Sequence, residues 1–211
     1  MLLAVVQIGS EALYGRLPQA LGVRIYRAID AVAPAGFVSD GLANAALQNG
    51  DPAAAEHDAV RMPAGPRRDE MLARVARARG EIVLAREYDF AAGDVSAIQA
   101  EVARLARTDV YGALALEARF RDHLIALGTH PDAVAESYSI SGNYTMWLKN
   151  YRGALALQER ALALAPRNLG YLLSAATDAD FAGDRARANA LFRRGLAIDP
   201  ACRPCREGLT R

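Results

Sequence analysis

The sequence predicts an all-α protein: an α-α superhelix, or solenoid, of stacked helical hairpins. Alanine- and leucine-rich runs end in a proline at Pro166 and again at Pro200. Alanine and leucine recur at spacings of three and four, whereas apolar and polar residues never alternate for long enough to predict a strand. The two prolines are separated by the length of a repeated helical hairpin, about 34 residues, and such a hairpin buries its apolar face only by stacking on its neighbours. We therefore expect one continuous solenoid of about ten or eleven helices.

Residues 1–34 form the first predicted element, a helical segment that begins MLLAVVQIGSEALYGRLPQALG. It has no charge before Glu11 and no basic residue before Arg16. It falls short of the roughly 20 apolar residues of a membrane span and lacks the basic start of a signal peptide. Two interpretations stay open: a helix that caps the solenoid, or the lower end of a trimmed membrane anchor or signal segment, which would make the chain membrane-proximal.

Residues 35–93 predict degenerate hairpins of the same kind. A first pair of helices turns at Gly50 and stops at Pro63, because proline lacks the backbone donor that a helix interior needs. A second pair turns at Gly80. The alternative for this second pair is one long helix that ends at Gly93.

Residues 94–130 carry two helical runs, AIQAEVARLAR and VYGALALEARFRDHLIALG, that are out of phase with the period set by Pro166 and Pro200. We interpret them as an irregular helical pair that joins two blocks of repeats. Pro131 then restores the register.

Residues 131–200 contain the two clearest repeats. Small residues stand where paired helices would approach closely, at Gly142, Ala154, Ala176 and Ala188. Larger side chains would overpack at these sites. The turns within the two hairpins fall at Lys149–Asn150 and Gly183–Asp184, with the same separation as the two prolines. Glycine and asparagine favour the left-handed conformation that ends a helix, and Asp184 is placed to cap the helix that follows.

Both repeats can be aligned with the pattern aromatic-x2-Leu-Gly-x2-Tyr, Ala-x3-Phe, Pro. The aligned residues are Tyr138, Ser141, Gly142, Thr145, Ala154, Gln158, Ala161 and Pro166, then Leu172, Ala175, Ala176, Ala179, Ala188, Phe192, Gly195 and Pro200. On these residues the chain resembles the tetratricopeptide repeat family over roughly residues 132–200. Gln158 departs from the pattern by replacing a large apolar residue, and Ser141 by replacing leucine. The resemblance implies a non-enzymatic scaffold or adaptor that binds proteins.

The resemblance also implies where a partner binds, because the first helix of each tetratricopeptide pair lines a concave groove. The matching positions are Glu136, Ser139, Asn143, Met146 and Trp147 in the first repeat and Leu173, Thr177, Asp180 and Phe181 in the second. These side chains suit an extended or helical peptide held by apolar anchors, with Asn143 fixing the peptide backbone. The alternative for Trp147 is that it covers the neighbouring repeat. We do not expect the carboxylate clamp of some family members, because Ser139 and Ser174 stand in two of its positions.

No pattern in the sequence points to catalysis, a metal site or a cofactor. His57, His123 and His130 form no ligand-spaced pair, no serine lies in a GxSxG motif, and no glycine-rich phosphate loop occurs. We therefore expect no catalytic residues, no bound metal and no cofactor. The formal net charge of +1 gives no reason to expect nucleic acid as a partner.

Residues 201–211 are expected to cap the C-terminal end, and they hold the one motif able to do chemistry, Cys202-Arg203-Pro204-Cys205. Such a pair can lower a thiol pKa, form a disulfide or supply half of a zinc site. The redox interpretation needs a preceding strand and the zinc interpretation a second pair, and the sequence has neither. We favour packed, unreactive thiols, and keep a thiol-dependent or metal-dependent accessory protein as the alternative function. The favoured function is a bacterial protein-protein adaptor, cytoplasmic or membrane-proximal, whose oligomeric state stays open.

Overall fold

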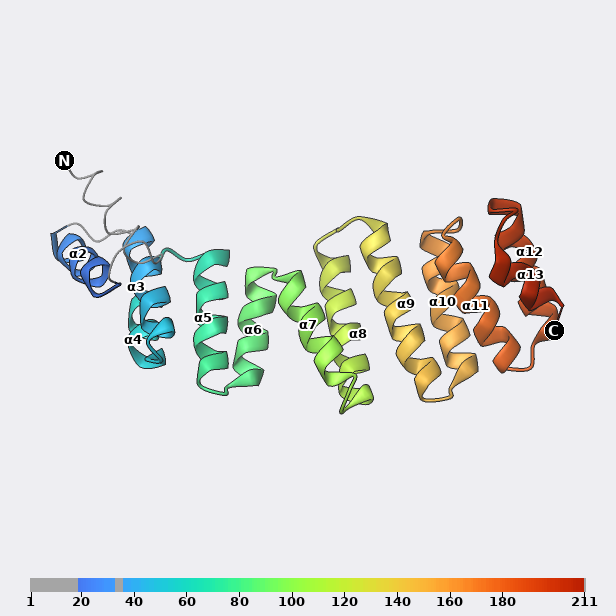
Figure 1. Cartoon of the computed structure of the whole chain (residues 1–211), viewed down its shortest axis with the longest axis horizontal. Helices are drawn as coiled ribbons and strands as arrows, with labels where there is room; N and C mark the ends of the chain where they lie inside the picture. Colours follow the sequence, from blue (N-terminus) through green and yellow to red (C-terminus); the bar gives the residue numbers. More distant parts are fainter. Residues whose placement is uncertain (1–18, 33–35, 211) are drawn as a thin grey trace. The chain divides into compact units, whose positions relative to one another are not determined.

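The computed structural model describes residues 19–32 and 36–210, and its secondary structure in that part of the chain is helical throughout (Figure 1). The helices are α2 (Gln19–Val32), α3 (Gly36–Gln48), α4 (Pro52–Ala59), α5 (Pro66–Ala78), α6 (Ile82–Ala92), α7 (Val95–Leu105), α8 (Val110–Ala126), α9 (Pro131–Trp147), α10 (Tyr151–Leu164), α11 (Leu169–Phe181), α12 (Arg185–Ile198) and α13 (Arg203–Leu209). The all-α prediction is confirmed. These twelve helices in the described residues exceed the number expected, because α13 forms a short helix in the predicted capping segment.

The helices group into two compact units, divided within α7. Unit 1 runs to Ile98 and unit 2 begins at Gln99. Within each unit, helices that follow one another pack as antiparallel neighbours, as α5 and α6 do in unit 1 and α9 and α10 in unit 2 (Figure 1). A single solenoid across both units stays a prediction. The segment before Gln19, with both of its interpretations, lies outside the described residues. None of the described helices is long and apolar enough to cross a membrane.

Glycines in the left-handed conformation set the turns of unit 1. Gly50 (φ 72°) separates α3 from α4, and Gly80 (φ 77°) separates α5 from α6. The predicted break at Gly80 is therefore confirmed, and the alternative of one long helix to Gly93 is wrong. Buried apolar residues such as Val38 and Met71 fill the space between these helices.

Unit 1 is also held by arginines that reach buried carboxylates on neighbouring segments. Three aspartates are paired in this way: Asp58 with Arg27, Asp89 with Arg77, and Asp30 with Arg61. Arg27 on α2 donates two hydrogen bonds of 2.8 Å to the carboxylate of Asp58 on α4, which is fully buried. A fork of two charge-assisted bonds fixes the geometry of both helices at that point.

The two hairpins α9/α10 and α11/α12 of unit 2 repeat with the predicted period. Their turns contain a left-handed residue at the same place in each repeat, Lys149 (φ 60°) in one and Gly183 (φ 81°) in the other. The side chains of Asn150 and Asp184 cap α10 and α12 by accepting from the backbone N–H of the third residue on, at 3.1 and 3.0 Å. The predicted cap at Asp184 is confirmed.

Small residues pack the repeats, with one difference from the prediction. Ala154 and Ala188 are fully buried, as expected for close helix contacts. At Gly142, however, the nearest neighbour is a side chain and not a helix backbone. A Cβ atom there would lie 2.7 Å from Nε2 of Gln158, which is also fully buried. Gln158 thus takes the space of the apolar residue that the family pattern has, and Gly142 leaves room for it.

Candidate interaction surface

Four aromatic side chains gather where α9, α10 and α11 begin or end. We call Tyr144, Trp147, Tyr151 and Phe181 the aromatic surface. The rings of Tyr144 and Trp147 lie 5.1 Å apart at 59°, and those of Tyr151 and Phe181 stack at 5.1 Å and 21°. Trp147 is 61% exposed and Phe181 56%.

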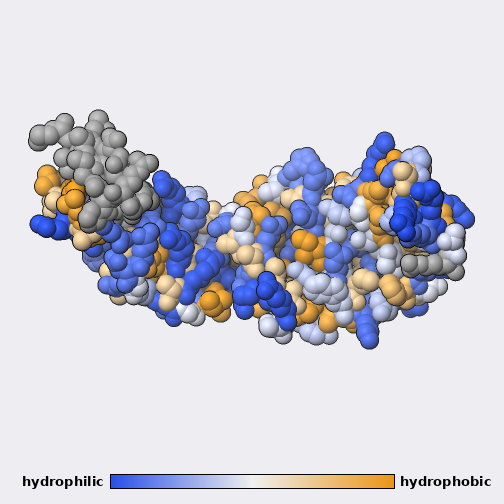
Figure 2. Space-filling model, in the orientation of Figure 1, coloured by the Kyte–Doolittle hydropathy of each residue, from blue (hydrophilic) through white to orange (hydrophobic). Residues whose placement is uncertain are grey.

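The repeat explains this placement. Trp147 is the last residue of α9 and Phe181 the last of α11, at matching positions of successive repeats. Each stands just before the turn of its hairpin, where a side chain at the helix end is not covered by the partner helix. Single apolar residues are scattered among hydrophilic ones over the face seen in Figure 2. The aromatic surface differs from these because its rings contact one another in two pairs, Tyr144 with Trp147 and Tyr151 with Phe181.

The predicted groove residues differ in how far their side chains are exposed. Glu136 and Asn143 are exposed, as are Trp147 and Phe181, whereas Met146, Leu173, Thr177 and Asp180 are partly buried. Ser139 is 7% exposed, and its backbone carbonyl accepts a hydrogen bond of 3.2 Å from Gln158. We therefore leave Ser139 out of the surface that a partner could touch.

Asn143 is exposed but hydrogen-bonds to the same buried glutamine. Its Oδ1 accepts a hydrogen bond of 3.1 Å from Nε2 of Gln158, the atom that also donates to the carbonyl of Ser139. This contact fixes the orientation of the Asn143 amide on α9. The sequence position alone gives no sign of it, because the two residues are 15 positions apart.

Asp180 is held at the other end of the surface. Arg185, the first residue of α12, donates from Nη1 to Asp180 at 2.6 Å and from Nη2 to the carbonyl of Gly208 at 2.8 Å. One arginine thus connects the end of α11 to α13. Surface pairs of this kind contribute little stability on their own, but this one sets the position of the residue next to Phe181.

Tyr144 connects the aromatic surface to a buried carboxyl on α8. Glu117 is fully buried, and burial raises its pKa, with a smaller rise from Glu136; Ser137 and Arg121 offset part of this. Burial also raises the pKa of the Tyr144 hydroxyl, and the nearby Glu117 adds to that rise. Both groups therefore hold their protons to higher pH than usual.

Trp147 and Phe181 are among the groove positions expected from the repeat, whereas Tyr144 and Tyr151 are not. Tyr151 is the first residue of α10, and its counterpart in the next repeat is Arg185, the first residue of α12, so the repeat pattern does not mark it. Tyr151 stands directly after the turn that follows Trp147, and this position could have predicted that the two side chains lie near the same hairpin turn. Helix ends on both sides of a turn lie close together whatever the repeat pattern is.

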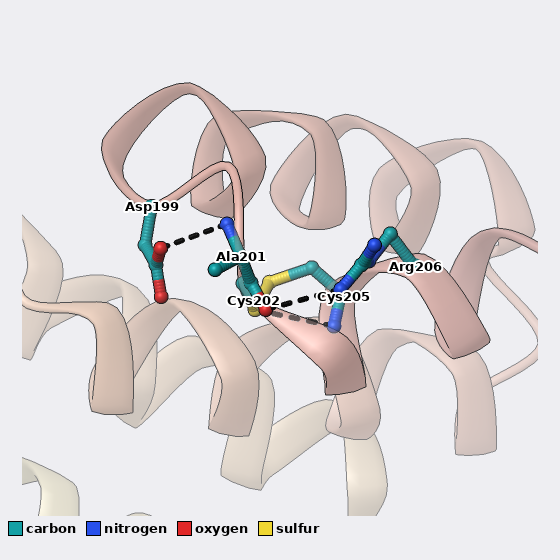
Figure 3. Close-up of a disulfide and its surroundings, with 5 residues drawn as sticks. All are labelled: Asp199, Ala201, Cys202, Cys205 and Arg206. Atoms are coloured by element: carbon teal, nitrogen blue, oxygen red, sulfur yellow. Dashed lines mark hydrogen bonds between the residues drawn. A yellow bond between two sulfur atoms is a disulfide. The ribbon is translucent and has the colours of Figure 1, made fainter.

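The two cysteines do not fit the prediction of unreactive thiols, because Cys202 and Cys205 form a disulfide (Figure 3). Cys202 is the N-cap of α13, and its Sγ accepts from the backbone N–H of Cys205 at 3.2 Å. The residues are 4% and 0% exposed. Among the residues described by the structure, no cluster of histidine, cysteine or carboxylate side chains could hold a metal ion.

No family model and no curated protein matches this chain. The solved structures similar to it include the following two. The APC/C hetero-tetramer Cut9-Hcn1 is 17% identical with a TM-score of 0.46, over 98% of this chain and 42% of that chain. The C-terminal part of a TPR repeat-containing protein from Cytophaga hutchinsonii is 13% identical with a TM-score of 0.46, over 97% of this chain and 99% of that chain. This chain thus spans less than half of the first of these.

The tetratricopeptide-like character of unit 2 is visible in its own helices. Two antiparallel hairpins follow one another with the period predicted from the sequence, with their turns at Lys149 and Gly183 and their small buried residues in matching places.

Proposed function

We propose that this chain is a non-enzymatic protein-interaction scaffold, and that unit 2 binds a peptide or protein segment at the aromatic surface. The observation that carries the proposal is the exposure of two large rings, Trp147 at 61% and Phe181 at 56%, each in contact with a second ring. Aromatic side chains that become buried on binding contribute a large share of the affinity of protein interfaces.

The ring contacts also favour binding through preorganisation. Tyr144 restrains the rotamers of Trp147, and Tyr151 restrains those of Phe181. Less side-chain entropy is lost when a partner covers rings that are already ordered. The aromatic surface can therefore act as a rigid anchor for apolar side chains of a partner.

Polar groups next to the rings would set the register of the partner. Gln158 holds Oδ1 of Asn143, which leaves the Nδ2 group of Asn143 to donate to a peptide carbonyl. At the other end, the carboxylate of Asp180 can accept from a peptide N–H while Arg185 keeps it in place. An extended segment fits such a row of anchors and backbone contacts.

The alternative, a thiol- or metal-dependent accessory protein, has less support. A nucleophilic thiolate needs a free thiol, and the sulfur atoms of Cys202 and Cys205 are joined in a disulfide. The proposal predicts that the double variant Cys202→Ser/Cys205→Ser binds partners nearly as well as the parent. Binding that follows the redox state of the pair, or a metal lost in the variant, would favour the alternative.

The test begins with short random peptides displayed against the folded chain. Trp147 is the only tryptophan in the sequence, so its fluorescence reports directly on binding at the surface. For peptides selected in this way, we expect Trp147→Ala and Phe181→Ala each to weaken binding about 30-fold, measured by the anisotropy of a labelled peptide, since truncating an anchor costs about 2 kcal/mol.

Two further variants make the result specific. Leu127→Ala removes a side chain that is 62% exposed before the start of α9, about 25 Å along that helix from Trp147, and it should change binding by less than about twofold. Asn143→Asp keeps the oxygen that Gln158 needs but removes the amide donor. If the Trp147 and Phe181 variants, shown to be folded, bind as tightly as the parent, the aromatic surface is not the site.

A further inference from the structure

Helix α13 covers the C-terminal end of the unit 2 core in a close-packed arrangement. Sγ of Cys205 lies 2.6 Å from the point where a Cβ of Gly195 would be, and ring atoms of Phe192 lie 2.4 Å from the corresponding point at Gly208. Both contacts need glycine on one side. Cys205 belongs to the same apolar cluster as Phe192 and Leu172.

The helix itself is short. α13 has seven residues, fewer than an isolated helix needs to be stable in water, so its order depends on tertiary contacts and on its first turn. The disulfide closes that first turn, from the N-cap Cys202 to Cys205 (Figure 3). A second contact holds α13 from outside the C-terminal segment. Among the described hydrogen bonds of unit 2, it is the one that Arg185 of α12 donates to the carbonyl of Gly208.

Reduction would change the packing at the close contact between Cys205 and Gly195. Two sulfur atoms without a bond between them need more room than a disulfide, and close-packed interiors resist even small increases in volume. Gly195 lies directly against Cys205, and Leu169 also lies close to Gly195 on that side. The reduced sulfurs therefore cannot spread toward α12, so the room must come from an outward movement of α13.

We propose that the Cys202–Cys205 disulfide is a redox latch: a dithiol reductant opens it and α13 leaves the end of the core. A thiolate of the reductant attacks Sγ of Cys202, the residue that is 4% exposed where Cys205 is 0% exposed, and Cys205 leaves as a thiolate that takes up a proton. The second thiol of the reductant then attacks the mixed disulfide and releases Cys202. Two electrons and two protons pass to the protein, and the reductant becomes a cyclic disulfide.

The released state exposes Phe192, which the backbone of Gly208 otherwise covers, and frees Arg185 from its contact with α13. Helices α9 and α10 keep their own packing, because within the described residues α13 packs on α12 and α11 and not on them. The latch therefore acts on the end of the unit alone, and it does not depend on the proposed function of the aromatic surface.

Hydrogen exchange measured by mass spectrometry on the full chain tests the latch. Three samples are compared: the oxidised chain, the same chain after native treatment with dithiothreitol, and the variant Cys202→Ser/Cys205→Ser. We expect the amides of α13 to exchange at least tenfold faster in the second and third samples, while α9 and α10 exchange at unchanged rates. Arg185→Gln, which removes the other contact and keeps the disulfide, should accelerate α13 less.

Several outcomes would overturn the latch. One is unchanged protection of α13 in the reduced chain, with both thiols confirmed free by alkylation. A second is a disulfide that dithiothreitol cannot open in the folded chain. A third is loss of protection in α9 and α10 together with α13, which would show that the disulfide holds the whole unit.

Discussion

The two units treat buried acidic residues in opposite ways. In unit 1, Asp58, Asp89 and Asp30 are each paired with an arginine of a neighbouring segment. In unit 2, Glu117 and Asp178 are as deeply buried, at 0% and 2% exposure, yet within the described residues neither forms a salt bridge. Burial raises the pKa of both, that of Asp178 to about 7.

The difference lies in how the buried acidic residues are paired. Both units bury alanines in their helix contacts, such as Ala55 and Ala73 in unit 1 and Ala154 and Ala188 in unit 2. The units differ in that arginines of neighbouring segments reach the buried aspartates of unit 1, whereas within the described residues no arginine forms a salt bridge with Glu117 or Asp178 in unit 2. An acidic residue in that setting can avoid the cost of a buried charge by binding a proton. Unit 1 should therefore depend on particular ion pairs, and unit 2 on sterics and pH.

The largest effect is expected from breaking an ion pair in unit 1. Arg27→Met leaves the buried carboxylate of Asp58 with only Nδ1 of His57 at 3.3 Å, which should lower the free energy of unfolding by about 3 kcal/mol. Arg27 itself is 44% exposed, so we place the effect at the lower end of the range for buried pairs. Urea denaturation of the full chain, followed by hydrogen exchange in α2 to α4, measures it.

The matched control is the double variant Arg27→Met/Asp58→Leu. It removes the buried charge together with its partner and should recover much of the lost stability. A single variant as stable as the parent would mean that Asp58 does not need Arg27, and that the contrast between the units is wrong.

A smaller effect is expected from steric change in unit 2. Gly142→Leu puts a side chain where Gln158 lies and should lower the free energy of unfolding by about 1 to 3 kcal/mol or more. The comparison in unit 1 is Gly80→Ala, where a Cβ meets nothing within 4 Å and only the left-handed backbone resists, at a cost of about 1 kcal/mol. Thermal unfolding that leaves Gly142→Leu unchanged would contradict the packing described for unit 2.

The sequence was sufficient for the regular part of the fold. The period between Pro166 and Pro200 predicted the hairpins of unit 2, and turn residues such as Gly80 predicted helix ends, because both are local signals. Trp147 and Phe181 followed from the same period. Local patterns of this kind can be recognised in a single sequence.

What the sequence could not show depends on residues that meet only after folding. Arg27 and Asp58 are 31 positions apart, and nothing in either neighbourhood marks them as partners. In the sequence, Gln158 only departs from the family pattern. Its burial against Gly142 becomes evident in the folded structure, where the two positions meet between the helices. The disulfide was one of several options left open for Cys202 and Cys205, since a CxxC spacing permits a bond without requiring one.

The smallest effect expected is a pH dependence that belongs to unit 2. The pKa of Asp178 is raised from 3.8 to about 7 because burial disfavours its charged form. The folded chain therefore binds this proton more tightly than the unfolded chain, so the stability linked to it is fully present below about pH 4 and is lost as pH rises to about 7.

Asp178→Asn keeps the shape but removes the charge and should stabilise the chain by about 1 to 2 kcal/mol at pH 8, since a buried amide still has a desolvation cost. Urea denaturation at pH 5 and pH 8 measures the change, with Asp180→Asn, a partly buried carboxylate paired with Arg185, as the control. If the stability of Asp178→Asn relative to the parent is the same at both pH values, Asp178 is ionised in the folded chain. Unit 2 would then contain a buried charge without an arginine partner, unlike the buried aspartates of unit 1.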